Sequence, residues 1–446
     1  MPDTEAAASA SRRGLPIPRV SPAVLACAVS RLLDLAEGRQ EGHALRVAHV
    51  ALATTRSLAL SREERAGVLF GAVLHDLGAA HAGRVLPREQ LGREDQVFQQ
   101  APLQLPHVVA SRYPPHVGPS VRRALEEHAV AGADLAQRFG APRQAVAAIL
   151  GHHEHWDGTG YPQGRRGTDT EPVARIVGMA DVVESYLALH GNPLAARQGL
   201  NDFLLQQRGN WFDPSLADIL IEATRADLFW WDLHATESAS LLLAEAGLVD
   251  QKPLDLDALE AAAAALAEAV DARTGHLHGY GAAAARLADG IARRAGVDGE
   301  RARLVYLAGL LHDIGALALS GRLLFKVDVL TVEELEQMQR HPTVARDLLE
   351  TLPGMGEIAR WIGQHHERVD GRGYPDGLEG DALALEARIL ALADVYCALR
   401  SDRPYRRALG RADALDVIRG LSGTHLDPAL VHTFLRATDL HEPLSE

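Results

Sequence analysis

Two cysteines are all that this chain of 446 residues contains, and long hydrophobic runs are missing. Both Cys27 and Cys397 stand in apolar stretches, so the sequence predicts buried thiols rather than a disulfide framework. No uninterrupted apolar run reaches the roughly 18 residues that a membrane span requires. The N-terminus also lacks the apolar segment of a secretion signal. We therefore expect a cytoplasmic protein without a membrane partner.

Basic residues are in deficit, with 45 Lys and Arg against 59 Asp and Glu, which gives a net charge of −14. This balance argues against nonspecific binding to nucleic acid, although it is compatible with a local basic pocket for a small anion. Alternating β-branched runs between glycine turns are scarce as well. Apolar residues instead recur at intervals of three and four, for example over 303–313 and 382–399. The pattern predicts an all-α protein.

An internal repeat organises the chain. GHHEHWDGTGYPQG at 151–164 is matched by QHHERVDGRGYPDG at 364–377, and further matched segments lie on either side. The interval His153–Asp181 is 28 residues, and so is the interval His366–Asp394. Matched segments at equal spacing indicate two copies of one fold. A chain of this length also exceeds what a single core usually supports.

The repeat sets the expected domain boundaries. We expect a first domain over 22–235, a linker over 236–254 and a second domain over 255–440. Residues 1–21 are rich in Ala, Ser and Pro and are predicted to form a disordered tail. The first copy carries about 24 additional residues, so an insertion is expected at about 80–120.

Both copies set histidines and aspartates inside apolar helical patterns. A buried ionised carboxylate is costly unless it is paired or bound to a metal. A lone helical histidine is usually a surface or satisfied core residue, but the whole set recurs at equal spacing here. Imidazole mixed with carboxylate suits Fe, Mn, Zn or Ni, and five or six ligands exceed the needs of one tetrahedral zinc. The residues therefore favour two divalent transition metals per competent domain, able to promote displacement at phosphorus.

The His-Asp-x-Gly segments, a later histidine, HHExxDGxGYP and the downstream ADVY and RPYR segments together resemble the HD-GYP family. The resemblance spans both halves and implies two tandem HD-superfamily helical domains. It further implies metal-dependent hydrolysis of a cyclic dinucleotide, with cyclic di-GMP as the first expectation and cyclic GMP–AMP as the second. Fe or Mn is the expected metal, and Zn or Ni is the alternative.

Positions that match the family motif are implied to have its roles. The metal ligands would be His43, His75, Asp76, His128, His152, His153 and Asp181 in the first copy, and His312, Asp313, His341, His365, His366 and Asp394 in the second. Of these, Asp76 and Asp313 are also assigned to catalysis. The loops expected to shape the substrate opening contain Gly158, Gly160, Tyr161 and Pro162, and Gly371, Gly373, Tyr374 and Pro375.

Two positions depart from the family pattern. Tyr280 stands where the first copy has His43, so the second copy has His276, His278 or no ligand from this helix. We assign His276, because it lies on the same helical face as Tyr280. The lysine of the family's HDxGK motif is alanine in both copies, at positions 79 and 316. This loss bears on turnover more than on metal binding, because the ligands remain.

The second copy retains basic residues that can orient phosphates. Lys326, Arg403 and Arg406 are the candidates, and solvated surface charge is their alternative interpretation. We therefore expect hydrolysis in the second copy, with the first copy binding metal in a regulatory role. A noncatalytic cyclic-dinucleotide sensor or a partner-docking protein is the alternative, and the GYP stretches disfavour a nucleotide phosphohydrolase. A homodimer or a signalling-protein partner stays open.

Overall fold

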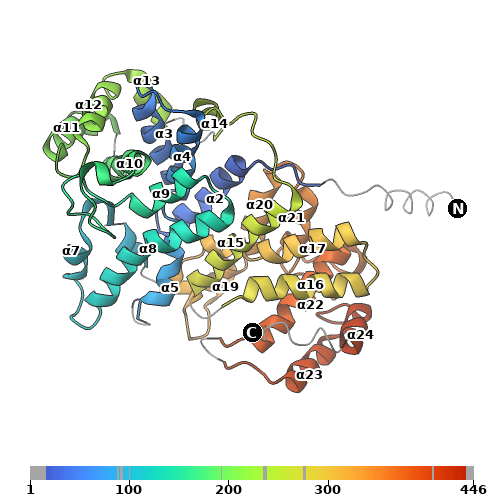
Figure 1. Ribbon diagram of the computed structural model, residues 1–446. Coiled ribbons are helices and arrows are strands. Elements are labelled where there is room, and N and C mark those ends of the chain that lie inside the picture. The colour runs from blue at the N-terminus through green and yellow to red at the C-terminus, as the bar shows by residue number, and fades with distance from the viewer. Residues whose placement is uncertain are drawn as a thin grey trace.

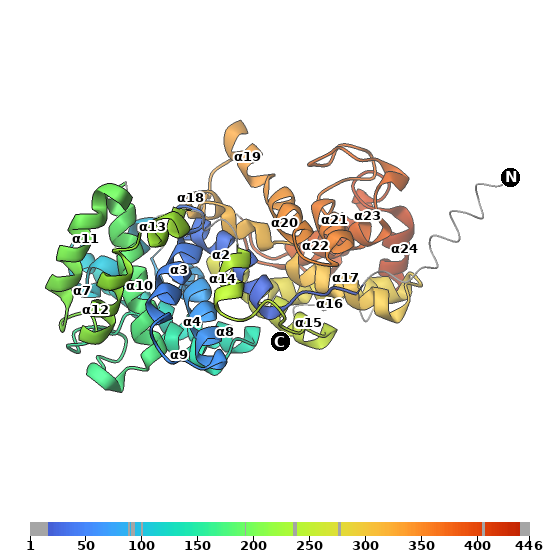
Figure 2. The ribbon, with the colours of Figure 1, turned by 90° about the horizontal axis from the view of Figure 1, so that it is seen from above.

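The computed structural model describes residues 17–87, 90, 94–99, 101–191, 193–234, 239–274, 278–403 and 406–437. Over these ranges the regular elements are helices, and a few isolated β-bridges occur outside them. The all-α prediction is confirmed. Seen from above, the N-terminal repeat and the C-terminal repeat lie beside each other (Figure 2). Among the described residues, no helix combines the length and apolar character needed to cross a bilayer.

The N-terminal repeat is built around five helices that carry the predicted ligands, with α2 beside them. These are α2 (Pro22–Ala36), α3 (His43–Thr55), α4 (Arg62–Leu74), α8 (Gly118–Phe139), α9 (Arg143–Gly151) and α10 (Pro172–Leu189). The short η1 (Leu77–His81) follows α4, and η4 (Gly167–Asp169) precedes α10. Beyond them lie α11 (Pro193–Gln207), α12 (Pro214–Ala223) and α13 (Asp227–His234). In Figure 1 this repeat runs from blue to green.

The expected insertion contains short helices between η1 and α8. They are α5 (Ala82–Val85), α6 (Glu94–Phe98), η3 (Ala101–Leu103) and α7 (Pro106–Ala110). Val97, Phe98 and Val109 form a small buried cluster with residues of α8. The insertion is therefore packed onto the side of the N-terminal repeat.

The C-terminal repeat follows the same order. Its elements are α15 (Leu256–Thr274), α16 (Tyr280–Arg294), α17 (Gly299–Leu311), η5 (Ile314–Ala318), α18 (Gly321–Leu324), α19 (Val332–Met338), α20 (His341–Glu350), α21 (Gly356–Gly363), η6 (Gly380–Ala382), α22 (Leu385–Arg400), α23 (Arg411–Leu421) and α24 (Pro428–Arg436). Helix α15 packs on α8 and η1 of the N-terminal repeat. One continuous apolar core runs through both repeats, and it includes the two buried, free cysteines.

Local sequence explains how the ligand-bearing segments are placed. Ser61 and Glu64 form a capping box that starts α4, and Asp298 caps α17, its counterpart. The glycine after each His-Asp pair permits a close crossing of η1 on α8 and of η5 on α20. A Cβ on Gly78 would lie 1.9 Å from the carbonyl oxygen of His128, and one on Gly315 would lie 2.1 Å from that of His341. These glycines therefore bring each His-Asp pair against the helix that carries the middle histidine.

Two predicted connecting segments are packed against the helices. The tail expected over 1–21 lies outside the described residues up to residue 16. The N–H of Arg19 donates to the carbonyl of Pro353 at 2.9 Å, so the rest of it contacts the C-terminal repeat. The linker expected over 236–254 contains α14 (Ala239–Glu245), which packs on α3 through the buried Leu242 and Leu243.

Candidate metal centres and substrate cavity

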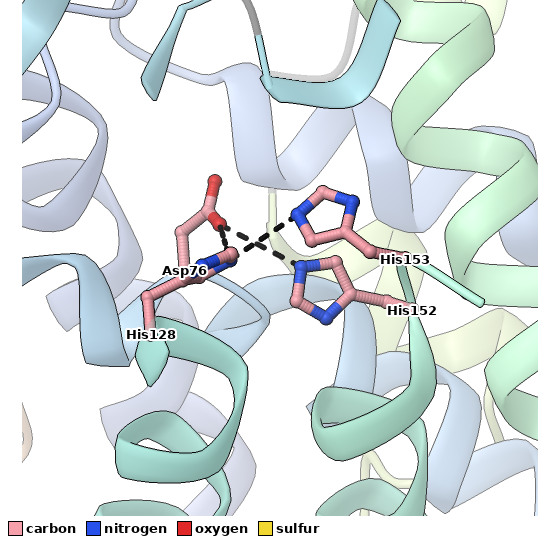
Figure 3. Close-up of side chains that lie close together, drawn as sticks. All are labelled: Asp76, His128, His152 and His153. Carbon is pink, nitrogen blue, oxygen red and sulfur yellow. Dashed lines mark hydrogen bonds and ion pairs between the residues drawn. The ribbon is translucent and has the colours of Figure 1, made fainter. Parts of the chain in front are cut away.

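Predicted ligands from five helices of the N-terminal repeat lie together. His43 begins α3, His75 and Asp76 follow α4, His128 belongs to α8, His152 and His153 follow α9, and Asp181 belongs to α10. Figure 3 shows the Asp76 carboxylate and the imidazoles of His128, His152 and His153 pointing toward one another. All seven ligands predicted for the first copy therefore meet in one place.

The ligands form two groups that share Asp76. One group contains Asp76 with His128, His152 and His153, and the other contains Asp76 with His43 and His75. Within each group the ligand atoms lie within 4.8 Å of one another. Asp181 joins the second group, because its Oδ1 lies 3.6 Å from Nε2 of both His43 and His75. A carboxylate shared by two ligand groups suits a binuclear centre.

Hydrogen bonds to the backbone fix the orientation of the imidazoles. Nδ1 of His75, His128 and His152 donates to the carbonyl oxygen three residues earlier, at 2.7, 2.6 and 2.6 Å. A carbonyl oxygen only accepts, so Nδ1 carries the proton and Nε2 presents its lone pair. This arrangement is common in metal sites, where the second ring nitrogen is held by a partner outside the centre.

Several buried ligand atoms have no hydrogen-bond partner within the described part of the chain. They include Nε2 of His43, His75 and His152 and both carboxylate oxygens of Asp181. A buried polar atom without a hydrogen bond costs about 1–3 kcal/mol, and several point into one small region here. Divalent metals would satisfy all of them, so the residues fit the group that the sequence predicts.

The pKa shifts of His152, His153 and Asp76 favour metal-binding protonation states. Burial, reinforced by His128 and His75, lowers the pKa of His152 to about 4. Burial also lowers the pKa of His153 well below its ordinary value. Burial works to raise the pKa of Asp76, but the adjacent His75 outweighs it and holds that pKa well below the usual range. At neutral pH, His152 and His153 are thus neutral imidazoles and Asp76 is an ionised carboxylate. Burial works to lower the pKa of His75, but Asp76 and Asp181 outweigh it and hold that pKa well above its usual value.

Sequence reasoning missed Glu184, which supports His43 from behind. Its carboxylate accepts from Nδ1 of His43 and, at 2.7 Å, from Nε of Arg46. Burial alone would raise the pKa of Glu184, but His43 and Arg46 lower it to about 2. The available signal was an acid one helical turn after Asp181 in the same apolar helix. Glu184 completes a carboxylate–histidine pair typical of metal sites.

The C-terminal repeat brings its six predicted ligands together as well. His341, His365 and His366 form one group with ligand atoms within 4.8 Å of one another. Asp313 Oδ1 lies 3.4 Å from Nε2 of His341 and 4.0 Å from that of His365. Asp394 Oδ1 lies 3.6 Å from Nε2 of His312, whose Nδ1 donates to the carbonyl of Gly309. This centre is thus similar to the first in its three-histidine group.

The other metal position differs at Tyr280. The hydroxyl of Tyr280 donates to the carboxylate of Asp394, where His43 faces Asp181 in the first repeat. Cys397 takes the position of Glu184, three residues after the late aspartate in both copies. His276 lies outside the described residues, and His278 is exposed. The second repeat has therefore lost both the first-helix imidazole and its supporting carboxylate.

Profiles of the HD domain family match residues 41–186 and 264–430. The chain is a tandem HD-domain protein. It is 26% identical over 440 residues to the 3'3'-cGAMP-specific phosphodiesterase 3 of Vibrio cholerae, covering 93% of this chain and 94% of that protein. It is 38% identical over 178 residues to the cyclic di-GMP phosphodiesterase response regulator RpfG of Xanthomonas campestris, covering 38% and 46%.

A solved structure shows that the tandem HD arrangement is shared. The crystal structure of a cyclic GMP-AMP specific phosphodiesterase of Vibrio cholerae aligns with a TM-score of 0.64 at 24% identity. The alignment covers 95% of this chain and 99% of that chain. The prediction of two tandem HD-superfamily domains is confirmed, and the GYP stretches make them HD-GYP in type.

The C-terminal HD domain opens its ligands into a cavity of about 400 Å³. Asp313, His341, His366 and Asp394 line it together with Tyr374 of the GYP loop. The predicted phosphate-binding residues Lys326, Arg403 and Arg406 line it too. The volume falls within the range of small-molecule sites, so metal ligands and basic residues face one ligand-sized space.

The three basic residues of this cavity have different partners. Lys326 Nζ pairs with Glu334 at 2.5 Å. The guanidinium of Arg403 lies 5.0 Å from the centre of the Tyr280 ring. Arg406 donates to the carbonyls of Ala398 and Leu399 at 2.8 and 3.1 Å, which fastens its guanidinium to the end of α22. Lys326 is accordingly better placed than Arg406 to turn toward a phosphate.

The GYP loops cover the histidine pairs of the two HD domains. Tyr161 packs on His153 and Tyr374 on His366, with ring centroids 4.6 and 4.9 Å apart. Gly158 and Gly371 have positive φ angles, and Gly160 and Gly373 press against the backbone of the HHE segments. Pro162 and Pro375 follow the two tyrosines in the chain. Among these loop residues, Tyr374 lines the main cavity, and Pro375 lines a neighbouring hollow of about 280 Å³.

The glutamate of each HHE segment holds its loop, a role that the sequence analysis did not assign. Glu367 accepts from the backbone N–H groups of Asp376, Gly377 and Leu378 at 2.7, 3.0 and 3.1 Å. Glu154 accepts in the same way from the N–H groups of residues 163 and 165. Buried charge-assisted bonds of this kind rigidify a loop. Glu367 therefore fixes the wall that carries Tyr374.

Proposed function

We propose that this protein is a metal-dependent phosphodiesterase that hydrolyses a cyclic dinucleotide in its C-terminal HD domain. The cavity carries the proposal, because metal ligands, Lys326, Arg403 and the Tyr374 ring face one space there. Relatives aligned over almost the whole chain are named for 3'3'-cGAMP. We therefore propose 3'3'-cGAMP as the first substrate to test, and cyclic di-GMP as the second.

The candidate metal ligands in the cavity would hold the metals that the reaction requires. When bound, divalent metals (Fe or Mn, with Zn or Ni as alternatives) supply activation of a water nucleophile and neutralisation of charge at phosphorus. His312 and His365 keep Nε2 turned inward, because their Nδ1 protons are bonded to backbone carbonyls at 2.7 and 2.6 Å. Burial, with His312 and His341, lowers the pKa of His365 to about 4, so that this ring is a neutral ligand at physiological pH.

The remaining residues orient the substrate. Lys326 would exchange its bond to Glu334 for a phosphate oxygen, and Arg403, which also lines the cavity, offers a planar guanidinium. The Tyr374 ring gives an apolar face for a base or ribose. Hydrolysis adds the hydroxyl of water to phosphorus and a proton to the leaving ribose oxygen. The first product is a linear dinucleotide.

The test is turnover by protein loaded anaerobically with Fe or Mn and separated from free metal. Product formation from 3'3'-cGAMP and cyclic di-GMP should fall to background in Asp313→Ala. The matched Asp76→Ala change removes the equivalent carboxylate from the N-terminal HD domain and should leave measurable turnover. If metal-loaded wild-type protein cleaves neither substrate, the phosphodiesterase proposal fails. Binding of intact dinucleotide would then favour a sensor, consistent with the alanine at 316.

We also propose a cytoplasmic location and a small-molecule partner in place of nucleic acid or membrane. Cell fractionation followed by detection of the chain in the soluble or the membrane fraction tests the location. A homodimer or a signalling-protein partner stays a prediction, and its test is the molar mass of the purified protein in solution.

A further inference from the structure

The two metal centres differ in how far solvent reaches them. The Asp76 side chain is 11% exposed, against 28% for Asp313. The late aspartates differ in the same direction, with 1% for Asp181 and 13% for Asp394. In the C-terminal HD domain these residues line the cavity, whereas in the N-terminal HD domain they lie in the interior.

A residue of the insertion covers the N-terminal centre. Phe98, at the end of α6, is buried and packs edge-on against His128, with ring centroids 5.4 Å apart. The side chain of Gln99 donates to the carbonyl of Gly38 at 2.7 Å, which attaches this segment to the loop before α3. The second repeat has a chain shorter by about 24 residues at this place. The cover therefore belongs to the N-terminal HD domain.

Arg39 and Glu37 close the same side from the loop before α3. The Arg39 guanidinium donates to the Phe98 carbonyl at 3.3 Å and to the Ser185 hydroxyl at 3.2 Å. Glu37 is buried, with its Oε2 3.9 Å from Nε of Arg39, and burial together with the charge of Asp76 raises the pKa of the Glu37 carboxyl well above its usual value. Its counterpart is Thr274, 237 positions later as for every pair up to the His-Asp pair, and Thr274 lines the open cavity. Glu37 thus occupies a position where the C-terminal HD domain has the smaller Thr274 beside its open cavity.

We propose that the N-terminal centre is a sealed structural metal centre, which retains divalent transition metals and does not admit a cyclic dinucleotide. Its ligands come from five helices, so metals bound there tie α3, α4, α8, α9 and α10 together. Metal that binds only the folded state adds its binding free energy to stability. The Glu184–Arg46 support of His43 occurs in this domain alone, because the counterparts are Cys397 and Ala283. This role lies beyond the hydrolysis proposed for the other domain.

Contacts between the two domains connect the N-terminal metal centre to the cavity of the C-terminal HD domain. Asp76 leads directly into η1, and η1 packs on α15 of the C-terminal HD domain. Helix α15 also packs on α8, where Arg138 pairs with Glu268. The far end of α15 is Thr274 at the cavity. A filled N-terminal centre therefore holds the surface on which one wall of the cavity rests.

Chelator kinetics on the full chain test the proposal. Protein loaded with Mn²⁺ is mixed with excess EDTA, and metal remaining on the protein is measured over time after rapid desalting. We expect a fast class from the open centre and a slow class from the sealed one. The fast class should disappear in His365→Ala and the slow class in His75→Ala. A single class assigned to both domains would overturn the proposal.

Two buried phenylalanines of similar exposure provide a matched pair. Phe98→Ala should accelerate release of the slow class by at least about tenfold, because opening the cover then costs less. Phe139 is equally buried and ends α8, away from the metal centre, so Phe139→Ala should leave the release rate unchanged. Equal acceleration by both changes would mean general loosening and would refute the seal. Two release classes without any turnover would refute only the phosphodiesterase proposal.

Discussion

Restoring the missing imidazole and its carboxylate should convert the weaker metal position of the C-terminal HD domain into a tighter one. The change is Tyr280→His combined with Cys397→Glu, which reproduces His43 and Glu184 of the other domain. Tyr280 now donates to the Asp394 carboxylate and carries Arg403 on its ring face. A histidine there would face Asp394 as His43 faces Asp181, at 3.6 Å.

The expected magnitude follows from the supporting carboxylate. Partners outside a metal centre change metal affinity by about 10–100-fold, or about 1.4–2.7 kcal/mol. Cys397→Glu alone should be unfavourable, because it buries a carboxylate near Asp394 without an imidazole partner. Arg286 and Arg403 act on this position electrostatically and offset part of that cost. The two changes should therefore couple by at least about 1.4 kcal/mol in metal binding.

The assay is equilibrium Mn²⁺ binding to the full chain, followed as metal per chain against free metal. The weakest-bound metal of Tyr280→His/Cys397→Glu should bind about 10–100-fold tighter than that of Tyr280→His. Cys397→Ala in the Tyr280→His background controls for the loss of the thiol. If the two changes add without coupling, or if Cys397→Ala does as well, residue 397 does not support a ligand and the reasoning fails.

Three other predictions concern the cavity, its wall and pH. Ala316 lines the cavity, so Ala316→Lys should raise kcat/KM for the cyclic dinucleotide in steady-state assays. Ala79 is buried, so Ala79→Lys places a charge in the interior and should lower the free energy of unfolding by about 3 kcal/mol or more. Glu367→Ala should free the GYP loop and lower stability by about 2–3 kcal/mol in urea unfolding, with partial recovery in Glu367→Gln. Burial raises the pKa of Asp271 from 3.8 to about 7, so its stabilising contribution is complete below pH 4 and is lost as pH rises through 7. The gap of about three units is worth about 4 kcal/mol, and metal-free Asp271→Asn should lose less stability than wild type between pH 4 and 7 in the same assay.

Each of these three has a result that contradicts it. An Ala316→Lys protein with unchanged or lower kcat/KM would mean that the missing lysine does not limit turnover. Unchanged stability in Glu367→Ala would show that the loop is held by other contacts. Parallel pH profiles for wild type and Asp271→Asn would show that this carboxyl titrates normally.

The sequence alone determined the helical class, the duplication and which residues are candidate metal ligands. Histidine and aspartate inside apolar helices are costly to bury, and equal spacing in both copies, as between His153 and Asp181, excludes chance. These are local or repeated features, and they are readable without coordinates. The departure at Tyr280 was readable in the same way.

Tertiary structure decided how the ligands are shared, supported and reached. Glu184 stands 141 positions after His43, and its place one helical turn after Asp181 marks it as a buried acid but does not show that its carboxylate meets Nδ1 of His43. Whether Arg406 serves a phosphate or the end of α22 depends on where its chain folds back. Solvent access depends on Phe98, a residue of an insertion with no counterpart in the other copy. Closure, support and access arise from contacts between distant segments, and packing alone sets those contacts.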